Sequence, residues 1–305
     1  MIAISKIVLV MFLWAVCFPL ITAGSLYAPH LTFAALRAFL AGAALIGLGL
    51  ALRRPWPRGG RVWITLIGVG LGATSLGYLG MFMGSEYVLP GIATVLANTQ
   101  PLLAAILAGL VLKESLGRIG RVGMGLGFGG IVVIALPRLL AAQSGNFALG
   151  VTYILMAAIG ITISNVLIRS IAGRADPIMA MGAQLLIGGV PLLIGAYVFE
   201  DPSSVVWSVN FLLALAALSL FGSALVYWLW GTILATTELS RANAFSFLVP
   251  IFGLAMGAAF FGERLGWFEV VGIGLTLIGI ALANRRGPDG GKANVEALRN
   301  ARPVP

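Results

Sequence analysis

The sequence predicts an all-α integral membrane protein with ten transmembrane helices arranged as two inverted five-helix repeats. The first observation is composition: 60% of the 305 residues are hydrophobic and 10% are charged, whereas soluble domains are about 45–50% apolar and about 25% charged. The second is that charged and turn residues divide the chain into apolar blocks of roughly 20 residues, which is the length that crosses a bilayer. The third is an internal repeat.

The apolar blocks define the expected helices and the expected organisation of the chain. We expect spans at 5–24, 33–52, 62–83, 89–111, 119–137, 147–168, 178–199, 210–235, 241–261 and 267–284. The connections between the blocks are short, so no soluble domain is expected between them. We therefore predict a first repeat at 1–143, a second repeat at 144–284 and a disordered cytoplasmic tail at 285–305.

The loop charges predict the orientation. If the N-terminus is cytoplasmic, nearly all lysines and arginines of the loops lie on the cytoplasmic side, and only Arg138 and Arg264 lie outside. This bias follows the positive-inside rule. We expect a multi-pass protein of the cell's inner (plasma) membrane with both termini in the cytoplasm. The same distribution, in loops rather than along one face, argues against nucleic acid as a partner.

The internal repeat appears when the sequence is shifted by 149 residues. Pro101 then falls on Pro250, Glu114 on Glu263 and Tyr78 on Tyr227. Because each half holds an odd number of expected spans, the second half is inverted relative to the first. Inverted repeats with a substrate site near the membrane midplane are typical of secondary transporters.

Four segments carry a resemblance to a known family. They are LWAVCFPL (13–20), LRAFLAG (36–42), NTQPLLAAILAGLVLKESL (98–116) and its counterpart FLVPIFGLAMGAAFFGERL (247–265). With these motifs the chain resembles the drug/metabolite transporter superfamily and, within it, the EamA-like family. The resemblance implies that helices 1–4 and 6–9 surround a central cavity, with helices 5 and 10 outside. The general pattern is similar to the YddG-type exporters of aromatic and other neutral amino acids.

Several other classes of protein are excluded by missing residues. One cysteine and one histidine supply neither a thiolate zinc cluster nor an H-E-x-x-H metalloprotease site. The phosphate loop of ATP-driven pumps is absent from the sequence. Asp176, Asp201 and Asp289 fall in expected loops or the tail, so they offer no intramembrane aspartate pair. We expect no enzyme activity, no metal site and no cofactor.

Polar and aromatic residues inside the spans are the candidates for a substrate cavity, because polar groups are costly in a membrane without a function or a partner. Tyr78 and Tyr227 are mid-span and related by the repeat. Asn165 and Gln184 could bind a zwitterionic solute or join helices, and the sequence favours neither. Packing is the alternative role for the prolines, and a lipid-facing position for the aromatics. The full set is Trp14, Phe18, Ser75, Tyr78, Phe82, Thr94, Asn98, Pro101, Asn165, Gln184, Tyr227, Trp230, Asn243, Phe247 and Pro250.

Arg37 and Glu86 are the candidates for gating or coupling. Arg37 is the one basic residue inside an expected span, and we expect it to pair with Glu86; the alternative partner is a substrate carboxylate. No carboxylate falls clearly at the centre of a span, which favours facilitated diffusion or exchange over proton coupling. Glu86 is the remaining candidate for a proton carrier.

Together these features predict a monomeric secondary transporter whose partners are membrane lipids and a small-molecule substrate. We expect it to export small neutral metabolites, above all aromatic and neutral amino acids, by alternating access of the two repeats. The alternative is a proton-coupled exporter of drugs or other metabolites, such as hydrophobic cations or solutes of the nucleoside or sugar type.

Overall fold

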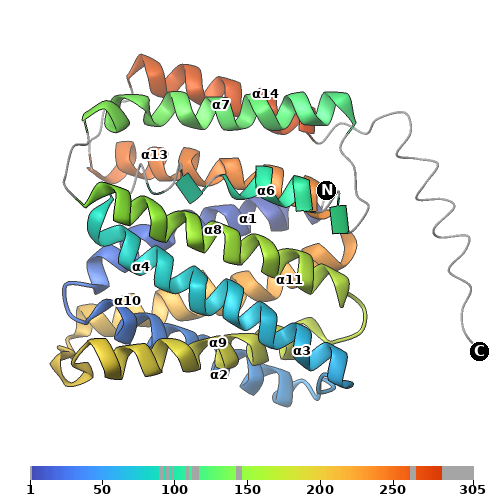
Figure 1. Ribbon diagram of the computed structural model, residues 1–305, viewed down its shortest axis with the longest axis vertical. Coiled ribbons are helices and arrows are strands. Elements are labelled where there is room, and N and C mark those ends of the chain that lie inside the picture. Colours follow the sequence, from blue (N-terminus) through green and yellow to red (C-terminus); the bar gives the residue numbers. More distant parts are fainter. Residues whose placement is uncertain are drawn as a thin grey trace, which may run out of the picture.

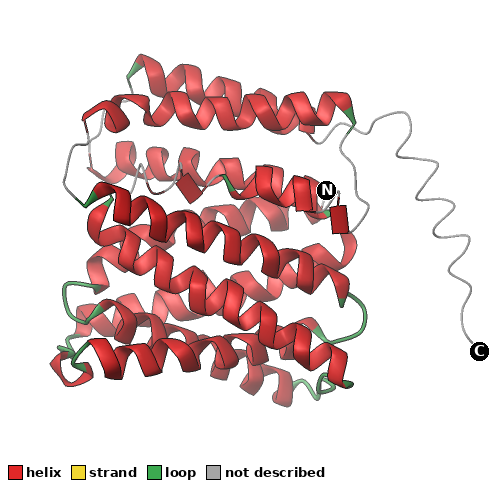
Figure 2. Ribbon diagram, viewed as in Figure 1, coloured by secondary structure: helices red, strands yellow, loops and turns green. Residues whose placement is uncertain are grey.

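The computed structural model describes residues 2–88, 93, 96–97, 99–107, 110–111, 117–141, 146–261 and 266–283. Over these residues the protein is helical and contains no strand (Figure 2). Within these described ranges, six helices are long and apolar enough to cross a membrane: Ile4–Gly24, His30–Ala51, Gly60–Tyr87, Phe147–Ser170, Pro177–Phe199 and Val209–Thr236. The expectation of an all-helical membrane protein is therefore confirmed for this part of the chain. The expected tail at 285–305 lies outside it.

The helices follow the expected apolar blocks closely (Figure 1). In the first half they are α1 (Ile2–Gly24), α2 (His30–Ala51), α3 (Gly60–Val69), η1 (Gly70–Leu76), α4 (Gly77–Tyr87), α6 (Gln100–Leu107) and α7 (Arg118–Ala141). In the second half they are α8 (Phe147–Ser170), α9 (Pro177–Phe199), η3 (Pro202–Ser204), α10 (Val209–Ser219), η4 (Leu220–Leu225), α11 (Val226–Thr236), α12 (Leu239–Ala244), η5 (Phe245–Phe247), α13 (Leu248–Phe261) and α14 (Trp267–Ala283). The expected span 89–111 falls partly on residues outside the description.

Two long helices contain a π-helical segment in the middle. The segments η1 and η4 interrupt what the hydrophobic pattern alone predicts as continuous α-helices. A serine hydroxyl bonds a carbonyl five residues back in each segment: Ser75 donates to Gly70 O (3.5 Å) and Ser223 to Leu218 O (3.1 Å). Such wide turns occur frequently at functional sites, and both segments lie beside the cavity described below.

Close helix pairs form the framework, and glycines allow the closest approach. The α7 and α14 helices run side by side at one edge of the molecule (Figure 1). A Cβ on Gly123 would lie 2.7 Å from the carbonyl oxygen of Gly279, and one on Gly130 would lie 2.6 Å from that of Gly272. Small residues are what allow backbones in a membrane to approach this closely.

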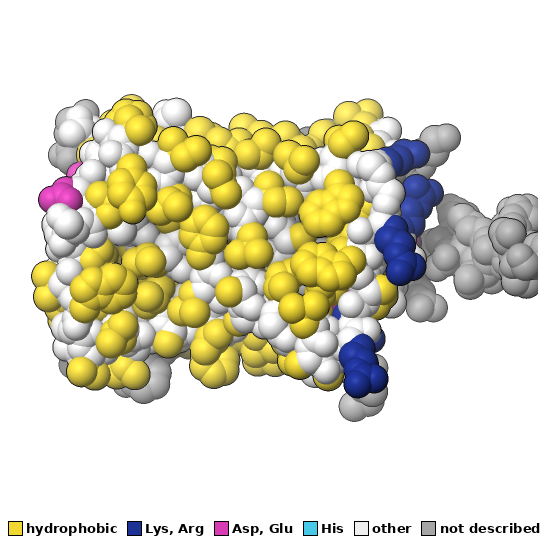
Figure 3. All heavy atoms as spheres, turned by 90° about the horizontal axis from the view of Figure 1, so that it is seen from below, with side chains coloured by type: hydrophobic (Ala, Val, Ile, Leu, Met, Phe, Trp, Pro, Cys, Tyr) yellow, Lys and Arg dark blue, Asp and Glu magenta, His cyan; other side chains and the backbone are white. Residues whose placement is uncertain are grey.

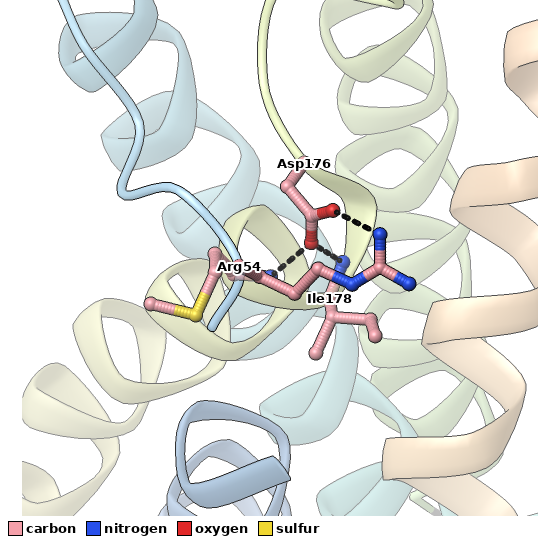
Figure 4. A network of polar contacts seen from close by, with 4 residues as sticks. Arg54, Asp176 and Ile178 are labelled. Atoms are coloured by element: carbon pink, nitrogen blue, oxygen red, sulfur yellow. Dashed lines mark hydrogen bonds and ion pairs between the residues drawn. The ribbon is translucent and has the colours of Figure 1, made fainter. Parts of the chain in front are cut away.

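The α2 and α9 helices form a second close pair, which is tied at both ends. At one end, the Glu200 carboxylate accepts hydrogen bonds from the backbone N–H groups of Leu31 and Thr32 (both 2.8 Å) and from the Thr32 hydroxyl (2.9 Å). At the other end, Asp176 caps α9 through Ile178 N and Met179 N and lies 3.8 Å from the Arg54 guanidinium (Figure 4).

The Asp176 cap gives a prediction about stability. Asp176→Ala removes the acceptor for two orphan N–H groups at the start of α9, so the free energy of unfolding in detergent is expected to fall by about 1 kcal/mol. Asp176→Asn keeps a capping oxygen and should lose much less. Because the Arg54 side chain is 49% exposed, its ion pair contributes little. An alanine variant as stable as the wild type would contradict this role of Asp176.

The outer surface of the helices is suited to lipid. Figure 3 shows hydrophobic side chains spread over the flank of the molecule, with the Lys and Arg side chains gathered at one end. Large apolar side chains remain exposed there, including Ile64 (72%), Leu213 (64%) and Ile278 (54%). Exposing so much apolar area to water would be unfavourable, so the fold defines a multi-pass membrane protein.

Candidate substrate cavity

A cavity of about 110 Å³ lies among the central helices. Its walls combine the two halves of the chain: α1, α2, η1, α4 and α6 from the first half, and α8, α11, η5 and α13 from the second. The lining residues are Trp14, Cys17, Arg37, Ala73, Tyr78, Met81, Ala97, Gln100, Ile154, Ala157, Ala158, Ile161, Asn165, Tyr227, Trp230, Ser246 and Val249.

One wall of the cavity is aromatic. The rings of Trp14 and Trp230 lie with their centroids 5.2 Å apart at an interplanar angle of 59°. The Trp230 indole N–H donates to Asn165 Oδ1 at 2.8 Å, which fixes the ring against α8. Aromatic surfaces with polar atoms at their edges suit a small solute that has both an apolar body and a polar group.

The second feature of the cavity is a buried cation, the side chain of Arg37. Arg37 is 2% exposed, and its guanidinium carbon lies 4.2 Å from the centroid of the Tyr78 ring. Its Nε donates to Ser223 Oγ at 2.7 Å, and Nη2 donates to the carbonyl of Gly222 at 3.1 Å. Tyr78 donates its own hydroxyl proton to the same Ser223 oxygen at 3.0 Å. Two hydrogen bonds thus join the Arg37 side chain to η4.

The expected pairing of Arg37 with Glu86 is wrong. The contacts of Arg37 are Ser223, Gly222, Cys17 and the Tyr78 ring, while Glu86 is exposed near the end of α4. The sequence placed both residues near the same face of the membrane. It could not show that the guanidinium turns inward onto the π-helical segment of another helix.

The structure brings six of the expected residues to the cavity: Trp14, Arg37, Tyr78, Asn165, Tyr227 and Trp230. Ser75, Phe82 and Gln184 are buried but pack between helices instead. Ser75 donates to the carbonyl of Gly188 at 2.8 Å, Gln184 accepts from Thr74 at 2.8 Å, and the Phe82 ring packs edge-on against Phe33. For these three residues, a role in helix packing is the one that the contacts support.

The residues expected from the proline-containing helices also fall away from the cavity. Asn243 donates to the carbonyl of Leu239 within its own helix, and Phe247 is fully buried against Gly127 of α7. Pro101 and Pro250 are buried but do not line the cavity. Thr94, Asn98 and the Phe18 side chain lie outside the described residues. Their neighbours in the sequence, Gln100 and Val249, line the cavity instead.

Sequence reasoning missed several lining residues, among them Cys17, Gln100 and Ser246. Cys17 lies three residues after Trp14 and so shares its helix face, which is a signal that could have been used. The alanines and Ile154, Ile161 and Met81 carry no chemical signal of a site. They supply shape, and only the folded chain shows which apolar positions face inward.

A cavity lined by both halves of a helical membrane protein is the arrangement found in secondary transporters. Over the described residues, no group of three or more His, Cys, Asp or Glu could hold a metal ion. The model of the EamA-like transporter family matches residues 1–136 and again 148–285. The chain therefore belongs to the EamA-like transporter family, as its motifs predicted.

Several relatives of the chain carry the names of transporters or efflux pumps. A WAT1-related chloroplastic protein of Arabidopsis thaliana is 30% identical over 258 residues, which are 82% of this chain and 62% of that protein. A probable amino-acid metabolite efflux pump of Salmonella typhimurium is 26% identical over 89% of this chain and 91% of its own length. A crystal structure with 20% identity matches 92% of this chain and 97% of its own with a TM-score of 0.79, which supports the same fold.

Proposed function

We propose that this protein is a secondary transporter that exports small neutral metabolites, in particular aromatic and other neutral amino acids. The observation that carries the proposal is the cavity, because it joins aromatic rings to hydrogen-bonding groups in one space between the two halves of the chain. An amino acid has the same two parts, an apolar side chain and a polar backbone. The name of the Salmonella relative agrees with this cargo.

We further propose ten transmembrane helices in two inverted repeats, at 1–143 and 144–284. Two matches to one family model, one in each half, support a duplication. The helix contacts support a two-fold relation, since α3 packs on α8 and α9 while α10 packs on α1 and α2. The Thr276 hydroxyl of α14 also donates to Gly127 O of α7, and these two residues are 149 positions apart, which is the length of the repeat.

Transport would then proceed by alternating access, in which the two repeats rock around the site between them. The gathering of Lys and Arg at one end of the molecule (Figure 3) supports an inner-membrane protein whose termini are cytoplasmic. Among the lining residues that the structure describes, none is a carboxylate. This favours facilitated diffusion or exchange by a monomer over proton coupling.

The proposal is tested with purified protein in proteoliposomes. We expect saturable uptake of labelled phenylalanine, methionine and threonine, with the same rate whether or not a pH gradient is imposed. Empty liposomes and phenylalanine competition serve as controls. Uptake that requires the gradient would favour the proton-coupled exporter of drugs or other metabolites and would direct attention to Glu86. No flux of any amino acid would refute the proposed cargo while leaving the fold unaffected.

A further inference from the structure

The cavity holds hydrogen-bond donors that the protein itself leaves without acceptors. Arg37 can donate five hydrogen bonds, and its Nε and Nη2 atoms have partners, but Nη1 has none among the described residues. The Nδ2 atom of Asn165 is also buried without a partner among the described residues, while its Oδ1 accepts from Trp230. Both residues line the cavity.

The charge of Arg37 is also uncompensated over the described residues. No carboxylate lies within ion-pair distance of its guanidinium there, and its remaining contacts are a hydroxyl, a carbonyl, a thiol and the face of Tyr78. A buried arginine is normally paired, because removing a charge from water is costly. Tyr78 offsets part of this cost through a cation–π contact. An acceptor with a negative charge would offset the rest.

Unpaired donors and an uncompensated positive charge together describe a site for an anion of defined geometry. Guanidinium groups bind carboxylates with directed, charge-assisted hydrogen bonds. We propose that Arg37, assisted by Asn165, binds the carboxylate of the transported solute, and that the carboxylate rather than the ammonium group selects the substrate. The apolar body would then lie against Trp14 and Trp230 on the aromatic wall. This inference rests on the proposed function and names the substrate group that its site recognises.

A carboxylate site built on Arg37 separates the candidate substrates by their charge. Hydrophobic cations would meet Arg37 at close range in a nonpolar cavity, where repulsion between like charges is poorly screened. Amino acids and monocarboxylates with an aromatic or aliphatic body can contact both Arg37 and the aromatic wall. The cavity of about 110 Å³ further restricts the occupant to a small molecule.

The test measures binding separately from transport. Purified wild-type protein in detergent is titrated with phenylalanine, with 3-phenylpropionate, which lacks the ammonium group, and with phenethylamine, which lacks the carboxylate. The shift in unfolding temperature reports binding of each probe. We expect both carboxylates to stabilise the protein and phenethylamine to bind at least about tenfold more weakly. Equal binding of phenethylamine and phenylalanine, or no binding of any probe, would overturn the inference.

Arg37→Gln is expected to lower the binding affinity for phenylalanine and 3-phenylpropionate roughly 10- to 100-fold, because it removes a charge-assisted hydrogen bond. Arg169→Gln is the matched control, because Arg169 bonds the carbonyl of Leu234 and does not line the cavity. A folded Arg37→Gln protein that binds carboxylates as the wild type does would refute the role of Arg37. If that variant does not fold, binding of the three probes to the wild-type protein still tests whether the site recognises a carboxylate. Selective carboxylate binding without amino-acid flux would refute the proposed cargo and support the inference.

Discussion

Replacing Gly130 by valine is expected to separate α7 from α14 and to cost about 3 kcal/mol or more of stability. A Cβ at this position would lie 2.6 Å from the carbonyl oxygen of Gly272 and 2.7 Å from the backbone nitrogen of Thr276. Both atoms belong to the backbone of a helix, so neither can move aside as a flexible side chain would. The free energy of unfolding in detergent and the fraction of monodisperse protein report the effect.

Gly129→Val is the matched control, since it makes the same substitution one residue earlier on the same helix. Nothing lies within 4 Å of a Cβ at Gly129, so its stability should change by less than about 0.5 kcal/mol. Equal stabilities for the two valine variants would show that α7 and α14 are not packed as closely as the structure has them.

Removing the Ser223 hydroxyl is the second change with a large expected effect. Ser223 Oγ accepts from both Arg37 and Tyr78 and donates to Leu218 O. Ser223→Ala removes the acceptor of the Arg37 Nε–H group and of the Tyr78 hydroxyl, both of which are buried, and a hydrogen bond to a charged group contributes about 1.5–3 kcal/mol. We expect stability to fall by about 2–3 kcal/mol, measured by unfolding in detergent.

Two further variants isolate the cause of this loss. Ser219→Ala removes another fully buried serine hydroxyl from the same long helix, but that hydroxyl has no hydrogen-bond partner in the described part of the chain, so its loss should be nearly neutral. Tyr78→Phe combined with Ser223→Ala should cost less than the sum of the single changes, because both remove one shared bond. Strict additivity, or equal losses from the two serine variants, would refute the network.

Hydrophobic blocks predicted the helices well because burial in lipid requires about 20 apolar residues and satisfied backbone hydrogen bonds. The start of α2 is an instructive difference: the apolar block begins at 33, whereas the helix begins at His30. The N–H groups of its first turn are satisfied by Glu200, which lies far away in sequence. A cap supplied by another element leaves no local signal.

The cavity was predicted less completely, and the reason is geometric. Tyr78, Tyr227 and Asn165 were found because polar atoms in a membrane-spanning helix must face either protein or a cavity. The same argument selected Gln184, whose carbonyl oxygen proved to accept from Thr74 between helices. Chemistry alone cannot separate these outcomes. The π-helical turns add to the difficulty, because one extra residue per turn rotates every later side chain about the helix axis.

The ties at the two ends of α2 and α9 have a mechanical consequence. Parting these helices at one end would break three hydrogen bonds to Glu200, and parting them at the other would break the contact between Arg54 and Asp176. The two helices are therefore joined near both ends, more strongly at Glu200 than at Asp176. Arg37 lies on α2, whereas Ser223 and Tyr78, which contact its side chain, lie on η4 and α4. A movement of those neighbours would slide the hydroxyl groups past a stationary cation and change which groups the guanidinium can reach.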